Sequence, residues 1–157
     1  MPSDLWDFAQ RLYGRPGVEH ACLQLQEAGA DVCLLLCGAW LQRHGMACTP
    51  ARLAHLQAIA QPWQTEVISP LRQLRQNWRK AAQQQAPLAA LRERLKGLEL
   101  DAEQQLLLAL QACAHDWARA NKSAVPAWLE ALAGTDADPD ALQLLHGPGE
   151  TVGASLV

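Results

Sequence analysis

The segment Val32–Leu41 constrains this chain most, because it is an unbroken apolar run of ten residues, VCLLLCGAWL. A helix that crosses a membrane needs about 20 such residues, so this run is too short to span a bilayer. A helix that is apolar around its whole circumference is typically surrounded by other helices. Asp31 precedes the run, where a carboxylate favours a helix N-terminus, and Gly45 follows it as a natural stop. The sequence therefore predicts a buried central helix over residues 31–44.

Helical patterns also dominate the rest of the chain, and the alternating β-branched runs typical of strands are nearly absent. Capping residues and prolines predict helix starts at Ser3, Pro16 and Thr49. Pro62 is expected to interrupt the helix that begins at Thr49. These signals predict an all-α fold.

A single apolar stripe runs over residues 87–117, either as one long helix or as two helices joined near residues 97–101. We predict a single-domain bundle of about six or seven helices over residues 3–133, packed around the central helix. Beyond it the composition shifts to Asp, Gly and Pro, so an acidic, glycine-rich and mobile tail is expected over residues 134–157. Within that tail, residues 138–145 are compatible with one further helical turn.

The cysteines and the first residues of the chain bear on its compartment. The start MPSDLWDFAQ lacks the basic and then apolar layout of a signal peptide, since Asp4 and Asp7 stand where lysines would be expected. Five cysteines at irregular spacing are typical of reduced thiols rather than of a disulfide framework. These features predict a cytoplasmic protein that does not enter a membrane.

Two cysteines of the central helix, Cys33 and Cys37, lie four residues apart and share a face with His44. Thiols and an imidazole suit zinc, but a structural zinc site usually needs four ligands and the chain offers no second pair. A thiol in so apolar a segment also lacks the electropositive pocket that activates a nucleophile. Core packing is the favoured interpretation, and neither a metal site nor a cofactor is predicted.

The strongest signal outside the predicted core is a basic region. Residues 71–98 hold seven basic side chains and one acid, Glu93, so this segment has a net charge of +6 in a chain of net charge −3. Three arginines recur at helical spacing beside the apolar stripe, and antiparallel packing would merge them with a second basic pair on the next helix. This basic patch consists of Arg72, Arg75, Arg79, Lys80, Arg92 and Lys96. The alternative interpretation is a solvated face that pairs with the acidic remainder of the chain.

Three stretches of the sequence resemble a known family: LWDFAQRLYGRPGVEHACLQLQEAGADVCLLLCGAWL (Leu5–Leu41), VISPLRQLRQ and LRERLKGLELDAEQQ. Over about residues 3–115 the chain is similar to an uncharacterised proteobacterial family of small, all-helical proteins, a domain of unknown function. The resemblance implies the all-α fold and a cytoplasmic setting, and it implies no reaction, cofactor or catalytic residue.

The chain contains no complete catalytic constellation, so the sequence does not favour an enzyme. We expect a non-enzymatic interaction or regulatory module that acts through the basic patch, a helical surface flanked by tryptophans. Its expected partner is an acidic protein surface or, through the long helices, a second copy of the chain. One alternative is a small-molecule or lipid-binding bundle in which Trp6, Tyr13 and Trp40 line an apolar pocket. The other is nucleic-acid binding through the basic patch.

Overall fold

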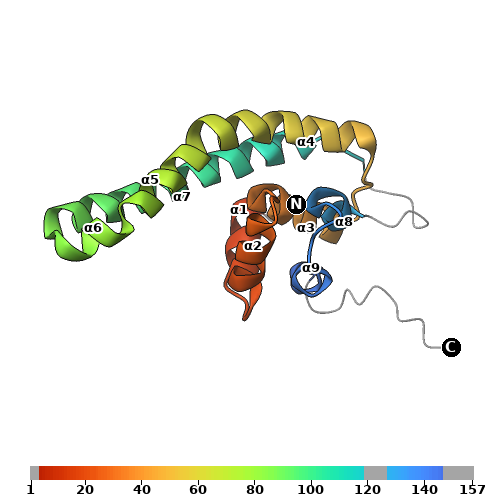
Figure 1. The fold of residues 1–157 in the computed structure, drawn as a ribbon. Coiled ribbons are helices and arrows are strands. Elements are labelled where there is room, and N and C mark those ends of the chain that lie inside the picture. Colours follow the sequence, from red (N-terminus) through yellow and green to blue (C-terminus); the bar gives the residue numbers. More distant parts are fainter. Residues whose placement is uncertain (1–3, 119–126, 147–157) are drawn as a thin grey trace.

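The computed structural model describes residues 4–118 and 127–146, and within those ranges it consists of helices without any β-strand (Figure 1). This confirms the predicted all-α class. No helix in the described ranges is both long and apolar enough to cross a membrane. In chain order the elements are α1 (Leu5–Tyr13), α2 (Val18–Glu27), α3 (Val32–Arg43), α4 (Pro50–Trp63), a π-helical segment η1 (Gln64–Ile68), α5 (Ser69–Asn77), α6 (Arg79–Gln84), α7 (Ala86–Ala114), α8 (Trp128–Ala133) and α9 (Pro139–His146).

Carboxylate caps determine where α1 and α3 begin. Asp4 Oδ1 accepts a hydrogen bond from the Trp6 N–H at 2.8 Å. Asp4 is therefore the N-cap of α1, whereas the predicted cap, Ser3, lies outside the described residues. Asp31 Oδ1 accepts from the Leu34 N–H at 3.2 Å, so the aspartate before the apolar run caps α3 directly.

Gly17 sets the start of α2, and Thr49 with Pro50 sets the start of α4. α2 begins at Val18 rather than at the predicted Pro16, because Gly17 takes a left-handed φ of +82° that an α-helix cannot include. α4 begins where the sequence predicted, with Pro50 in its first turn and the Thr49 hydroxyl accepting from the Arg52 N–H at 3.2 Å.

α3 is the centre of the fold, as its composition predicted. Every residue from Cys33 to Leu41 is buried, and α1, α4, α7 and α8 all pack against this helix. α8 approaches it most closely at Gly38. A Cβ atom at Gly38 would lie 2.7 Å from Leu132 Cδ1 and 3.3 Å from Trp128 Cβ, so the missing side chain lets the two helices touch.

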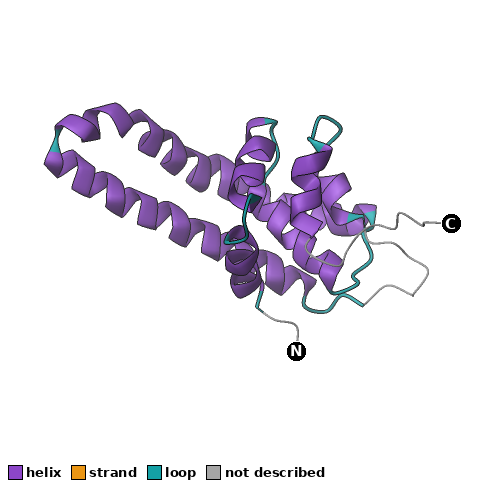
Figure 2. Ribbon diagram, turned by 90° about the horizontal axis from the view of Figure 1, so that it is seen from below, coloured by secondary structure: helices purple, strands orange, loops and turns teal. Residues whose placement is uncertain are grey.

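A long antiparallel hairpin, here called the arm, is formed by α4, η1, α5 and α6 on one side and by α7 on the other (Figure 1). The head, which consists of α1, α2, α3, α8 and α9, covers only the root of the arm, and the outer part projects beyond it (Figure 2). α7 is one continuous helix of 29 residues rather than two joined helices. Because no head element covers the outer arm, no residue of α5 or α6 is fully buried.

Two prolines, Pro62 and Pro70, lie in the side of the arm formed by α4, η1, α5 and α6, and the helical backbone continues through both. The sequence predicted an interruption at Pro62, but α4 continues through it to Trp63. The backbone then widens into η1, where the Ser69 N–H bonds to the Gln64 carbonyl oxygen. A proline removes one N–H donor from a helix, and the wider turn before Pro70 accommodates that loss without a break.

The C-terminal helices complete the core. Trp128 of α8 is fully buried and donates its Nε1–H to the Met46 carbonyl oxygen at 2.8 Å. α9 packs on α2 and buries Ala141 and Leu145. The mobile tail was expected from residue 134 onward, whereas residues 139–146 form a helix of the core. Residues 134–138 connect α8 to α9, and residues 147–157 lie outside the described ranges.

Candidate functional site

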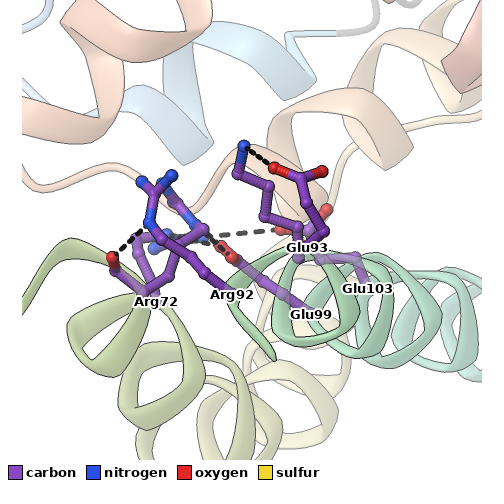
Figure 3. Close-up of polar contacts among 7 residues, drawn as sticks. Arg72, Arg92, Glu93, Glu99 and Glu103 are labelled. Carbon is purple, nitrogen blue, oxygen red and sulfur yellow. Dashed lines mark hydrogen bonds and ion pairs between the residues drawn. The ribbon is translucent and has the colours of Figure 1, made fainter. Parts of the chain in front are cut away.

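A buried carboxylate neutralises the inner part of the basic patch. Glu99 of α7 is only 7% exposed, and it accepts from Arg75 Nε at 2.5 Å and from Arg72 Nε at 3.3 Å. Arg72 Nη2 also lies 3.6 Å from Glu103 Oε1, and Figure 3 draws both side chains beside Glu99. A carboxylate this deeply buried requires charged partners, because desolvation alone would disfavour its ionised form. Arg72 and Arg75 therefore join the two sides of the arm instead of facing solvent alone.

Antiparallel packing brings the two basic helices together, which is the arrangement that the patch hypothesis required. Arg92 Nε on α7 donates to the carbonyl oxygen of Arg75 on α5 at 2.9 Å. Lys96 Nζ donates to Glu93 Oε1 at 2.9 Å within α7, and an exposed pair of this kind contributes little stability. Four of the six patch residues thus have local partners.

Three cations at the far end of the arm are exposed and unpaired. They are Arg79 and Lys80 on α6 and Arg94 on α7, and no carboxylate in the described ranges lies within ion-pair distance of them. Residues 79–96, here called the tip, hold five basic side chains and one acid, so the tip has a net charge of +4. Arg94 was not among the predicted binding residues, because it follows Arg92 by two positions and so falls on another side of the helix.

A pocket of about 690 Å³ opens where the head meets the root of the arm. Its walls come from α1, α2, α3, η1, α5 and α7, and its volume is in the range of small-molecule sites. Two of the three predicted pocket residues, Trp6 and Tyr13, line it. Trp40 does not, because it lies on the core side of α3, where it is buried and its ring centroid is 5.3 Å from that of His44.

Polar side chains from α2, η1, α5 and α7 and from the N-cap of α3 meet at the inner end of this pocket, here called its floor. Gln64, the first residue of η1, donates its Nε2–H to Asp31 Oδ1 at 3.0 Å. Arg72 and Glu103 form the ion pair described above. When the Gln26 amide is oriented with its oxygen toward Arg72, that oxygen accepts from Arg72 Nε at 2.9 Å. π-helical turns occur frequently at functional sites, and this one aims Gln64 into the pocket.

The two carboxyl groups of the floor ionise less readily than usual. Burial raises the pKa of Asp31, and it outweighs the hydrogen bonds that Asp31 accepts from Leu34 and Gln64. Burial, followed by repulsion from Glu99, raises the pKa of Glu103 despite the nearby Arg72. When Asp31 and Glu103 are ionised, the hydrogen bonds and the charge of Arg72 therefore compensate their negative charge only in part.

Residues 4–110 of the chain match a family described as protein of unknown function (DUF2390). The chain belongs to this family. The predicted resemblance to a domain of unknown function is thereby confirmed. The DUF2390 region runs from α1 almost to the end of α7, so it contains the tip and every residue that lines the pocket, whereas α8 and α9 lie beyond it. No curated protein and no solved structure matches the chain.

The thiols of the DUF2390 region do not form a site of their own. All five cysteines of the chain are free, and Cys33 and Cys37 are buried on α3. Burial raises the pKa of both thiols, which keeps them protonated at neutral pH. Among the described residues, no three His, Cys, Asp or Glu side chains are grouped so that they could hold a metal ion. Both thiols therefore act as small core side chains.

Asp31 is expected to lower the free energy of unfolding of the parent protein as the pH rises. Replacing Asp31 with asparagine should remove that contribution. The folded state holds the pKa of Asp31 above its ordinary value of 3.8, so above that pH it binds more protons than the unfolded chain. The contribution of Asp31 to the free energy of unfolding therefore falls as the pH rises through this window. Asparagine keeps an oxygen for the Leu34 and Gln64 hydrogen bonds.

The measurement is urea unfolding of Asp31→Asn and of the parent protein, followed by circular dichroism at about pH 4 and at neutral pH. The free energy of unfolding of the variant should rise relative to that of the parent between the two conditions. Glu103→Gln should shift in the same direction, because the pKa of Glu103 is raised as well. Parallel pH profiles for the parent and both variants would contradict the prediction.

Proposed function

We propose that this protein is a non-enzymatic interaction module whose arm presents a basic tip to an acidic protein surface. The observation that supports this most is the arm itself, which projects beyond the head and ends in cations without local partners (Figure 1). The tip has a net charge of +4 in a chain of net charge −3, so the remainder carries −7. A charge separation of this kind attracts an acidic surface to the tip and repels it from the head.

The side chains around the tip favour a protein partner over a nucleic acid. Leu91 and Leu98 are about half exposed and lie seven residues apart, on one face of α7. Exposed leucines beside cations suit an amphipathic acidic surface. Residues 79–96 contain no aromatic side chain, and Trp78, which precedes them, is partly buried, so the tip lacks an exposed aromatic ring on which an unpaired base could stack.

Reversing two tip charges is expected to weaken this interaction about tenfold or more, because two attractions become two repulsions. The variant is Arg79→Glu/Arg94→Glu, and the probe is a synthetic amphipathic helix of glutamate and leucine, titrated by fluorescence anisotropy. The matched control is Arg11→Glu/Arg43→Glu, which changes the net charge equally at two exposed arginines of the head. The control should bind the probe within about twofold of the parent.

Three results would contradict the proposal: no binding of the acidic helix, an equal loss in both variants, or tighter binding of a DNA oligonucleotide with a steep salt dependence. The third result would favour the nucleic-acid alternative. Sedimentation of the parent and of the tip variant addresses self-association. A dimer that Arg79→Glu/Arg94→Glu converts to a monomer would identify the partner as a second copy of the chain.

A further inference from the structure

The pocket at the root of the arm has an apolar rim made by separate helices. Tyr13 of α1, Leu23 of α2 and Leu100 of α7 are 37%, 48% and 50% exposed, and all three line the opening together with Trp6. A large apolar side chain left half in solvent is unremarkable when it stands alone. When such side chains converge on one cavity, they indicate a surface that an apolar ligand covers.

Beneath this rim, negative charge is in excess. Among the charged side chains that line the pocket, the carboxylates of Asp31 and Glu103 face one guanidinium group, that of Arg72, which also pairs with Glu99 behind the lining. The side chain of Asp31 receives hydrogen bonds from Leu34 and Gln64 and forms no ion pair among the described residues, although the charge of Arg72 acts on it from a greater distance. The N-terminus of α3 compensates its charge in part.

The remaining titratable groups around the pocket add no positive charge. Glu19 of α2 carries a further negative charge, which contributes to the raised pKa values of Tyr13 and Cys22. Burial is the main cause of both shifts and raises the pKa of Cys22 to about 11, so this thiol stays neutral. Cys33 is neutral for the same reason. The pocket therefore combines an apolar rim with a floor that attracts cations.

We propose that this pocket binds a small organic cation, a protonated amine carried on an apolar body. The ammonium group donates hydrogen bonds to the carboxylates of Asp31 and Glu103, and the apolar body covers Leu23 and Leu100. The ring of Trp6 adds an aromatic surface on which a cation or an alkyl chain can lie. The site is independent of the tip, so it is a second activity beyond the proposed docking function.

A bound cation favours the ionised form of both carboxyl groups, whereas burial raises their pKa values. Binding therefore releases protons at a pH at which these groups are partly protonated. The affinity for an amine should rise as the pH increases from acidic to neutral, as long as the amine itself stays protonated.

The test uses two amines with matched anions of the same body: octylamine against octanoate, and phenethylamine against 3-phenylpropanoate. Isothermal titration calorimetry at neutral pH should show each amine binding at least about tenfold more tightly than its carboxylate. Glu103→Gln should weaken amine binding about tenfold, because the near-isosteric amide removes one charge. The matched control is Glu66→Gln, the same substitution at an exposed residue of η1 that lines a different groove; it should bind as the parent does.

A second variant tests the apolar contact and does not depend on the stability of the floor. Leu100→Ser removes a half-exposed side chain of the rim and should weaken octylamine binding by severalfold. Equal affinity for amine and carboxylate, an unchanged affinity in Glu103→Gln, or an equal loss in Glu66→Gln would overturn the proposal. The tip variant Arg79→Glu/Arg94→Glu should bind the amines as the parent does, so failure of one proposal leaves the other standing.

Discussion

Trp128→Ala is expected to lower the free energy of unfolding by about 3–5 kcal/mol, the range found for large aromatic residues deleted from a core. Trp128 is fully buried, and its ring stacks on that of Trp117 with 5.9 Å between centroids and 5° between planes. Its indole N–H satisfies the Met46 carbonyl oxygen at 2.8 Å. Alanine would leave a cavity against α3 at Gly38 and an acceptor without its donor.

Chemical unfolding followed by circular dichroism measures this loss, with Trp63→Ala as the matched control. Trp63 is only partly buried and lines an open groove between the two sides of the arm, so its removal should cost clearly less stability. Trp128→Phe should fall between the two, because it keeps most of the ring but loses the hydrogen bond to Met46. If Trp128→Ala were no more destabilising than Trp63→Ala, α8 would not be a structural part of the core.

The second large effect is expected from Glu99→Lys, which should also lower the free energy of unfolding by about 3–5 kcal/mol. The substitution places a third cation between Arg72 and Arg75 at a position that is 7% exposed. Both arginines lose their common partner, and the new ammonium group is buried among like charges. Because Glu99 joins α5 to α7, the outer arm should open before the head does.

Hydrogen exchange read by mass spectrometry checks this prediction, since it reports opening of the arm separately from global unfolding. Amides of α5, α6 and the first half of α7 should lose protection in Glu99→Lys while those of α3 keep it. Glu93→Lys is the matched control, because it makes the same change on the same helix at an exposed side chain that pairs with Lys96. Similar exchange in the two variants would mean that the Glu99 pairs do not hold the arm together.

The sequence predicted the features of the fold that depend on neighbouring residues. The unbroken apolar run gave the central helix, and Asp31 and Thr49 predicted two helix starts because a cap acts on N–H groups two or three positions away. The continuation past Pro62 was not predictable in the same way. A proline weakens a helix locally, and α4 continues through Pro62 where it packs along α7, a contact between segments far apart in the chain.

The candidate sites were less predictable, because they depend on contacts between residues far apart in the chain. Glu99 follows the pattern of an exposed carboxylate, and only the antiparallel packing of α5 on α7 turns it into the buried partner of Arg72 and Arg75. The floor of the pocket joins Gln64 and Glu103 to Asp31, and no helical period relates those positions. Trp40 was misplaced for the same reason, since its periodicity shows that it is apolar but not which element covers it.

The single unbroken helix α7 makes the arm a lever with its fulcrum near Glu99. Residues 86–98 lie beyond that point, and at a rise of 1.5 Å per residue they extend for about 20 Å. A rotation of about 10° at the fulcrum therefore moves the far end by about 3–4 Å, which exceeds the length of a hydrogen bond. Small adjustments where the arm meets the head are thus magnified at the tip, by enough to make or break contacts there.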